Sequence, residues 1–420
     1  MLARRFPVLR RRDFLLLLAD RLIAPGALAF SIVGVSFAVL DAGGTPADLS
    51  YVLAAQIAPC LVFCLVGGVI ADRIAPQKVI AASNLLIALG EGTFGILVLT
   101  GRPQLWQMIL LEVLTGTGIA TFYPASQALL PSLVPDGELQ QASSLSRLAM
   151  NLAMMGGAAV AGVVVAVVGP GWALTICGAG VTATVPMLLS IKGEASSREP
   201  SGASMLRDLR EGWSEFRSHT WLWVIVGQYG LVMMAWYGGF EVLGPVVAKA
   251  HLGGAAAWGA VMAAQSVGLV AGGLLSLWRA PKHPMRLVAG AGVVLALTPL
   301  ALAMLWPLAL VCVVSFVVGT ATEYMMVVWT VTMARNIRPE ALARTSGYDG
   351  LGSMMATPLG ALIAGPAATH FGVGRVQYVA AALIAAVSLL ALLPREVRTR
   401  TDPPPVSLEP DIEVAAGPVG

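Results

Sequence analysis

Charged residues are scarce along this chain of 420 residues. Only 12% of the residues are Asp, Glu, Lys or Arg, whereas about 25% is usual in a soluble domain. So few charges cannot cover the surface of a water-soluble particle. The sequence has instead many apolar runs of the length that crosses a bilayer as a helix, about 20 residues. We therefore expect an all-α integral membrane protein.

Cysteine and histidine are also few, and they are scattered. The eight residues are Cys60, Cys64, Cys177, Cys312, His219, His251, His283 and His370. The cysteines lie inside apolar runs and the histidines at loops or span ends, which indicates neither a metal site nor a catalytic centre. The chain also lacks the G-x-x-x-x-G-K-[ST] loop that binds ATP and a basic stripe with interleaved aromatics for nucleic acid. We expect no enzyme, no cofactor and no nucleic-acid partner.

Twelve apolar stretches can be counted along the chain. They are residues 14–40, 48–71, 79–100, 104–131, 141–168, 171–191, 220–248, 255–278, 286–305, 307–334, 345–369 and 374–394. Most connections between them are short, but one is long and rich in charge and serine. The predicted units are a bundle of six helices over 1–191, a cytoplasmic linker over 192–219, a second bundle over 220–394 and a disordered cytoplasmic tail over 395–420.

Lys and Arg are distributed unevenly between the two sets of loops. The set that includes both termini holds 21 of the 26 basic residues, and the other set holds only Arg102, Lys249 and Arg375. Loops rich in Lys and Arg stay on the cytoplasmic side of a membrane. This asymmetry predicts that both termini are cytoplasmic, and it supports an even number of spans.

The two halves of the sequence can be aligned with each other at an offset of 203–205 residues. Gly67-Gly68 then falls on Gly272-Gly273, and Gly169 falls on Gly372. A single match is common in a chain rich in Gly and Ala, but the same register holds from the second span to the fifth. Because six spans separate the copies, the pattern favours a parallel repeat, which is one architecture of secondary transporters.

The segment Gly67–Lys78 reads GGVIADRIAPQK and resembles the cytoplasmic loop motif of the major facilitator superfamily. Two stretches, Pro124–Ala142 and Asp208–Trp213, resemble the bacterial subgroup that includes macrolide-efflux and enterobactin-exporter proteins. The resemblance covers roughly residues 10–395. It implies twelve helices in two parallel six-helix repeats around a central cavity. It also implies a monomer in the bacterial cytoplasmic membrane, in contact with lipid and a small-molecule substrate, with a proton gradient as the energy source.

By the same resemblance, the loop after the second span is a conformational switch. Its residues are Gly68, Asp72, Arg73 and Lys78. Glycine lets helix ends approach closely, and Asp72 can accept hydrogen bonds from an arginine or cap a helix N-terminus. Contacts of this kind form in one conformation and break in another. The alternative is a solvated loop that only fixes the topology.

Ionisable residues inside the spans need an explanation, because each costs about 2.5–3.5 kcal/mol to insert. They are Asp20, Arg21, Glu91, Glu112, Arg147, Glu241, Glu323 and Asp349. In the superfamily, spans one, four, seven and ten line the central cavity. The resemblance therefore places Asp20, Glu112, Glu241 and Glu323 on cavity spans, Arg147 on a supporting span and Glu91 on a peripheral one.

Glu323 is the strongest candidate for substrate binding or proton coupling. It lies near the middle of its span, beside Tyr324. A carboxyl group in apolar surroundings can exchange a proton near neutral pH, and it can also pair with a cationic substrate. The alternative for each intramembrane charge is an interhelical bond that only holds the bundle together.

The expected function is secondary-active export of a small, amphipathic or drug-like molecule by alternating access, with proton antiport as the coupling. Two alternatives remain within transport, namely a dedicated exporter of one metabolite such as a siderophore, and an importer. Outside transport, the alternative is a membrane receptor or enzyme, which would require a surface constellation that the scattered histidines do not provide.

Overall fold

The computed structural model describes residues 7–71, 75–101, 103–191, 213–214, 216–278 and 281–399. Within these ranges the regular structure is helical throughout. The first bundle contains a short helix, η1 (Pro7–Arg10), and six long ones. These are α2 (Arg12–Asp41), α3 (Pro46–Ala71), α4 (Pro76–Thr100), α5 (Leu105–Leu133), α6 (Asp136–Val168) and α7 (Pro170–Leu189).

The second bundle also has six spans, three of which are interrupted. The first combines α9 (Thr220–Trp236), η2 (Tyr237–Val242), α10 (Leu243–Val247) and η3 (Ala248–Leu252). The next are α11 (Ala255–Trp278), the pair α12 (Pro284–Leu295) and α13 (Leu297–Ala303), and α14 (Leu308–Asn336). The last are the pair α15 (Pro339–Met354) and α16 (Thr357–Phe371), and α17 (Val373–Leu390), with α18 (Arg395–Thr399) after it.

The predicted fold class is confirmed. Eleven helical stretches within the described residues are long and apolar enough to cross a membrane, and α3, with 26 residues, is the remaining span. Proline begins several of these helices, for example Pro76 and Pro284. Its fixed φ suits the first helical turn, where a backbone N–H would have no acceptor within the helix, so the absence of this group costs nothing. The observed bounds differ from the predicted ones mainly where a helix extends beyond its apolar run into a polar turn.

The internal repeat is visible in the structure. Gly169 and Gly372, which the sequence offset aligns, have φ of 95° and 87° and each precedes the last helix of its bundle. Only glycine adopts this backbone region without strain. The packing is repeated as well, since α4 contacts α7 and α3 contacts α5 in the first bundle, while α12 and α13 contact α17 and α11 contacts α14 in the second.

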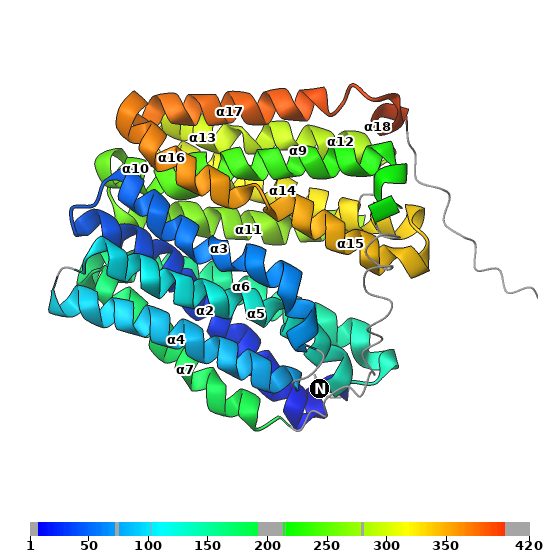
Figure 1. The fold of residues 1–420 in the computed structure, drawn as a ribbon, viewed down its shortest axis with the longest axis horizontal. Coiled ribbons are helices and arrows are strands. Elements are labelled where there is room, and N and C mark those ends of the chain that lie inside the picture. Colours follow the sequence, from blue (N-terminus) through cyan, green and yellow to red (C-terminus); the bar gives the residue numbers. More distant parts are fainter. Residues whose placement is uncertain are drawn as a thin grey trace, which may run out of the picture.

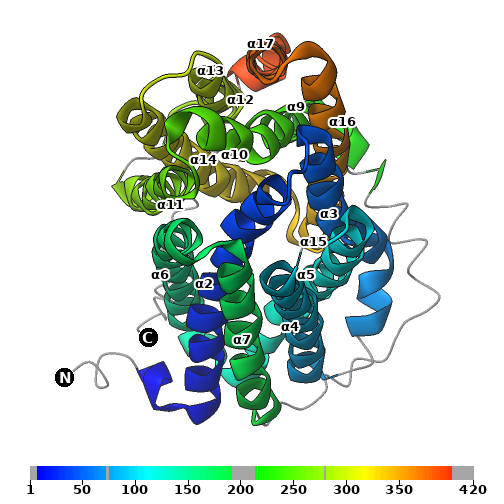
Figure 2. The ribbon, with the colours of Figure 1, turned by 90° about the vertical axis from the view of Figure 1, so that its left-hand side faces the viewer.

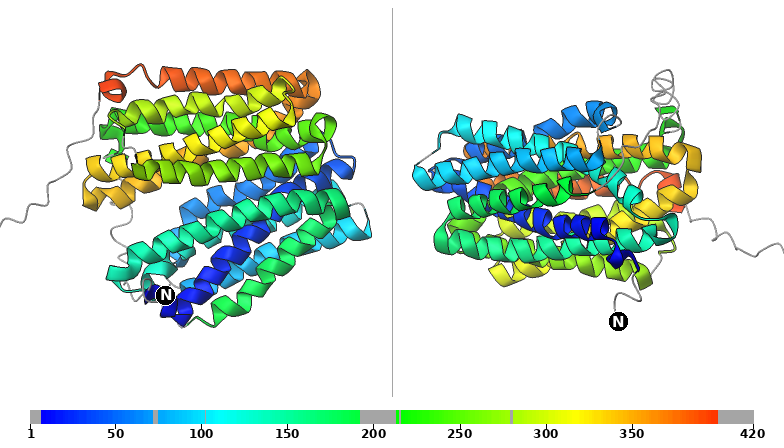
Figure 3. Two further views of the ribbon diagram at one scale, coloured as in Figure 1. Left: turned by 180° about the vertical axis from the view of Figure 1, so that it is seen from behind. Right: turned by 90° about the horizontal axis from the view of Figure 1, so that it is seen from below.

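The two bundles meet through two helix pairs, α6 with α11 and α3 with α16 (Figures 1 and 2). We call the end with η1 and α18, where Arg10, Arg11, Arg395 and Arg398 lie, the basic face, and the other end the opposite face. Gly162 lies against Gly259, and Gly365 donates its N–H to Ser50 Oγ over 2.7 Å. Both contacts lie toward the opposite face. From there the bundles diverge toward the basic face, as the view from behind also shows (Figure 3).

The predicted disordered tail needs a correction at its start. Residues 395–399 form α18, and Val397 is fully buried in a cluster that includes Trp221 and Met285. The backbone carbonyl of Arg398 accepts a hydrogen bond from Arg286. One apolar side chain in a charged segment is too weak a signal to predict this docking. The rest of the tail lies outside the described residues.

The glycine contact gives a first prediction. A β-carbon at Gly162 would lie 2.7 Å from Gly259 Cα, so Gly162→Val should weaken closure of the opposite face by about 1–3 kcal/mol, the usual cost of overpacking. The measurement is the thiol-labelling rate of Ser50→Cys in detergent-purified protein whose native cysteines are alanine. We expect labelling at least fivefold faster in the variant.

The matched control for this prediction is Gly156→Val in the same helix, where a β-carbon would meet nothing within 4 Å. It should leave the labelling rate unchanged. Equal rates for Gly162→Val and Gly156→Val would contradict the assignment of this contact as a closure point.

Candidate functional site

The opposite face is closed by an ion pair as well as by packing. Lys249, in η3 of the second bundle, donates from Nζ to Asp41 Oδ1 over 2.6 Å and to the Leu40 carbonyl oxygen over 2.7 Å. Leu40 and Asp41 are the last residues of α2. Lys249 is one of only three basic residues assigned to the sparsely charged loops. Its position therefore links the two bundles on the face where positive charge is rare.

An acidic wall lies on the second bundle. Glu323 in α14 and Asp349 in α15 are both only partly buried, and both are close enough to act electrostatically on Tyr229 of α9. Trp329 donates its indole N–H to Asp349 Oδ2 over 3.0 Å. Two carboxyl groups, a phenol and an indole thus come together from three helices. Such a set can bind a cationic, partly apolar molecule.

Arg147 faces this wall from the first bundle. It lies on α6 with its side chain exposed, and its positive charge acts on Glu323. No direct ion pair joins the two among the residues that the structure describes. The predicted site residues Arg147 and Glu323 are therefore brought near each other across the two bundles without contact.

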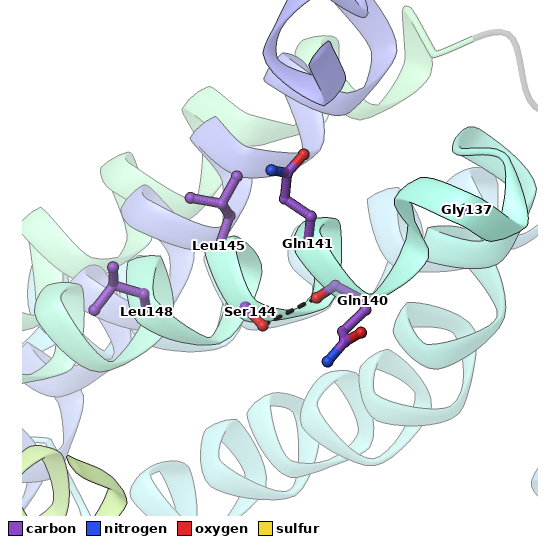
Figure 4. Close-up of a pocket in the computed structure, with 6 residues that line it drawn as sticks. All are labelled: Gly137, Gln140, Gln141, Ser144, Leu145 and Leu148. Atoms are coloured by element: carbon purple, nitrogen blue, oxygen red, sulfur yellow. Dashed lines mark hydrogen bonds between the residues drawn. The ribbon is translucent and has the colours of Figure 1, made fainter. Parts of the chain in front are cut away.

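The surface of α6 on the basic side of Arg147 is hollowed. A cavity of about 510 Å³ is lined there by residues of this helix, which Figure 4 shows. They are Gly137, Gln140, Gln141, Ser144, Leu145 and Leu148. Leu148 is 50% exposed, whereas Gly162, two heptads further along the same helix, is packed against the second bundle. The helix is thus closed off at the opposite face and accessible toward the basic face.

Tyr324 is partly buried and packs on the same apolar cluster as Tyr229 and Trp329. Adjacent residues on a helix point about 100° apart, so Glu323 and Tyr324 face different surroundings. The predicted pairing of the two in one site stays a prediction.

Glu112 lies inside the first bundle rather than at the wall between the bundles. It is fully buried in α5, and its Oε2 accepts a hydrogen bond from Gln56 Nε2 of α3 over 2.7 Å. The carboxyl group of Glu91 in α4 is close enough to repel it electrostatically. Glu91 is also fully buried and accepts from Ser31 Oγ of α2 over 2.6 Å.

The Glu91–Glu112 pair is the main feature that sequence reasoning missed. A peripheral role was expected for Glu91 because its span is peripheral in the superfamily. The signal that could have pointed to it is the excess of acids over bases inside the spans, which requires some acids to share an environment. The sequence did not show which ones.

Asp20 is also fully buried inside the first bundle. It accepts from Asn84 Nδ2 over 3.0 Å, and Asn84 donates to Thr184 Oγ1 over 2.7 Å. Arg21 donates to Ser126 and lies over the ring of Phe122 at 5.3 Å. These contacts tie α2 to α4, α5 and α7 and place Asp20 in the bundle interior.

Glu241 lies in η2, one of two π-helical segments in the first span of the second bundle. Such segments are rare and are frequent at functional sites. Tyr237, four residues earlier, is close enough to interact electrostatically with both Glu241 and Glu112. Glu241 is therefore near the place where η2 of the second bundle meets α3 of the first.

The predicted switch loop is described only in part. Gly68 is in the last turns of α3, whereas Asp72 and Arg73 lie outside the described residues. Lys78 is exposed in the first turn of α4, with its N–H bonded to the Ala75 carbonyl over 2.9 Å. The role of this loop as a switch stays a prediction.

Two repeated six-helix bundles, joined at one face and bearing charged groups between them, are the architecture of a membrane transporter built from parallel repeats. The family described as transmembrane secretion effector matches residues 5–413 of the chain. The chain belongs to this family, a branch of the major facilitator superfamily, and is a transporter rather than an enzyme. The predicted resemblance is thereby confirmed.

Two characterised relatives are exporters of different compounds. The chain is 28% identical over 364 residues to the enterobactin exporter EntS of Escherichia coli O1:K1, covering 82% of each. It is 21% identical over 390 residues to macrolide efflux protein A of Streptococcus pyogenes, covering 90% of this chain and 94% of that protein. Both similarities extend across the two bundles.

Solved structures share the fold at low identity. The nucleoside transporter NupG superposes with a TM-score of 0.70 at 12% identity, over 90% of this chain and 98% of that one. A bacterial homologue of the human lysosomal transporter Spinster, in an inward-facing conformation, superposes with a TM-score of 0.66 at 16% identity, over 90% and 97%. These likenesses concern the fold alone.

The Lys249–Asp41 pair gives a second prediction. Both side chains are partly exposed, with 40% and 47% of their surface accessible, so the pair contributes about 0.2–1 kcal/mol to closure. Asp41→Asn should raise the labelling rate of Ser50→Cys by about two- to fivefold. The charge-reversed double variant Asp41→Lys with Lys249→Asp should return the rate toward that of the wild type. A double variant that labels as fast as Asp41→Asn would exclude the ion pair as the reason.

Proposed function

We propose that this protein is a secondary-active exporter that moves a small amphipathic cation out of the cytoplasm by alternating access, in exchange for protons. The observation that carries the proposal is the acidic wall of Glu323 and Asp349, reached from the basic face and closed off at the opposite face. A substrate that enters from the basic face passes the hollow of α6 and reaches this wall. The proposal treats the chain as a monomer in the bacterial cytoplasmic membrane.

The sidedness of the proposal rests on the basic loops. Since 21 of the 26 Lys and Arg residues belong to one set of loops and termini, the basic face is assigned to the cytoplasm. The open side of the structure is then the cytoplasmic side. An exporter loads its substrate from that side or from the inner leaflet, so this conformation is the loading state.

The charge at the wall supports a cationic substrate. Two carboxyl groups on the second bundle face one guanidinium, that of Arg147, on the first. A cation bound at Glu323 would offset the cost of holding a carboxylate within the membrane. Tyr229, which is partly buried, adds aromatic surface beside the carboxyl groups, which suits the apolar part of such a molecule. Trp329 is buried and holds Asp349 in place through its indole N–H.

Proton exchange follows from competition at the same group. Glu323 can be neutralised by a bound cation, by a proton or by the approach of Arg147. Closing the bundles at the basic face would bring Arg147 toward Glu323 and displace the cation toward the other side. A proton taken up in the outward-open state would then release Arg147 and allow the return. Each state differs in what neutralises one carboxylate, which is what an alternating-access cycle requires.

The names of the relatives support export and leave the substrate class wide. EntS is named for a siderophore and macrolide efflux protein A for a class of antibiotics. A dedicated metabolite exporter is therefore the second candidate function. The acidic wall favours a cationic drug-like molecule over an anionic siderophore, because a negatively charged substrate would be repelled there.

A third prediction tests the exporter directly. Cells that express the wild type should accumulate less of a lipophilic cation such as tetraphenylphosphonium, and a protonophore should abolish the difference. Glu323→Gln should reduce this export at least tenfold, since the amide can neither carry charge nor exchange a proton. The control is Glu396→Gln, an exposed residue of α18, which should export like the wild type. The same assay with macrolides and siderophores tests the second candidate.

Two outcomes of this assay would contradict the proposal. Equal export by Glu323→Gln and the wild type would remove this carboxyl group from the cycle. Export of siderophores but of no cation would replace the cationic substrate by the dedicated metabolite.

A further inference from the structure

We propose that Glu91 and Glu112 form a second, separate proton-binding site, buried inside the first bundle, in which two carboxyl groups jointly hold one proton. The two residues come from neighbouring helices, α4 and α5, and both side chains are fully buried. They lie apart from the acidic wall, which belongs to the second bundle. The role of the site in transport rests on the proposed proton-coupled export, whereas its ability to bind a proton does not.

Each carboxyl group has one satisfied and one unsatisfied oxygen. Glu91 accepts from Ser31, and Glu112 accepts from Gln56. The remaining oxygens, Glu91 Oε2 and Glu112 Oε1, are buried without a hydrogen-bond partner. Buried acceptors are costly to leave unpaired. A proton on one carboxyl group converts an unpaired acceptor into a donor and removes one of the two negative charges.

Thr115 places a hydroxyl group beside the pair. Its side chain is fully buried and faces Glu91, although the two do not meet the geometry of an ordinary hydrogen bond. Thr115 lies on α5, one turn after Glu112. A hydroxyl that can both donate and accept is suited to a site whose carboxyl groups alternate between charged and neutral forms.

Among the residues that the structure describes, the groups that interact with the pair include no Lys or Arg. The groups that face it from the surrounding helices are Ser31 of α2, Gln56 of α3, Cys177 of α7 and Tyr237 of η2. Beyond Tyr237 lies another acid, Glu241. Along α2, Arg21 and the Asp41–Lys249 pair each lie about 15 Å from Ser31, at 1.5 Å per residue. Two ionised carboxylates this close in apolar surroundings would repel strongly, so the pair holds a proton.

The site is connected to the interface between the bundles. Gln56, which donates to Glu112, belongs to α3, and α3 packs on α16 of the second bundle. Tyr237 of η2 interacts electrostatically with Glu112, and η2 also contacts α3. Gln56 is only partly buried. Loss or gain of the proton therefore changes the net charge beside α3, and α3 is one of the helices that close the opposite face. Proton binding can in this way alter the stability of the closed conformation.

Infrared spectroscopy of the full-length protein in lipid vesicles tests the site without any substrate. The wild type should show the carbonyl stretch of a protonated carboxyl group that resists exchange in heavy water. Glu91→Gln and Glu112→Gln should each shift the pH at which this band titrates, since each removes one partner. The double variant should lose the part of the band that comes from the pair, whereas any contribution from the buried carboxyl group of Asp20 remains. Glu323→Gln is the matched control, because it removes a carboxyl group outside the pair, and it should keep the band.

Ser31→Ala provides a second variant that retains both carboxyl groups. It removes the donor to Glu91 and should shift the frequency of the band, so the proposal can be tested even where the double variant fails to fold. The proposal is overturned when the band persists unchanged in the double variant or, where that variant does not fold, in Ser31→Ala. It is also overturned when sodium ions abolish the band of the wild type, because the pair would then bind a monovalent cation.

Transport in vesicles then separates this inference from the proposed export. With tetraphenylphosphonium as the probe, the double variant should lose uphill transport driven by a pH gradient at least tenfold and keep downhill exchange. Uphill transport at the wild-type rate would overturn the coupling role of the pair. A wild type that moves no probe in either assay would refute the proposed cation export and leave the infrared result standing.

Discussion

Close backbone contact between the bundles at the opposite face sets how the two halves of the protein are placed. Gly162 against Gly259, and Gly365 against the start of α3, bring the helices together where any side chain would keep them apart. Within a membrane, where lipid is as apolar as the helices, such packing supplies much of the association between them. Because the bundles are held together at this end, the space between them lies toward the basic face.

Charge is distributed between the bundles in two different ways. In the first bundle, Asp20, Glu91 and Glu112 are fully buried and bonded to neutral side chains of neighbouring helices. In the second, Glu323 and Asp349 are partly accessible. The buried acids of the first bundle are thus shielded from solvent, and Glu91 and Glu112 lie close enough to interact with each other. The acids of the second bundle are more accessible.

The interrupted spans of the second bundle fit this division. The span that carries Glu241 changes from α to π geometry twice, and two other spans are broken into α12–α13 and α15–α16. The spans of the first bundle are continuous over their described residues. A bundle that is locally irregular can change its shape more easily than one with unbroken hydrogen-bonding ladders. The repeat therefore gives both halves one topology, while the details of their helices differ.

The twelve spans, the parallel repeat and the uneven distribution of basic loops could be predicted from the amino-acid sequence alone. They follow from hydropathy, residue pattern and charge, which can be read along the chain without knowing any contact. Which ionisable groups meet depends on tertiary packing. Glu91 joined Glu112, Arg147 came to face Glu323, and Lys249 paired with Asp41, because each meeting depends on how helices far apart in sequence are rotated and packed. A rotation of one residue turns a side chain by about 100°, and no local pattern fixes that angle.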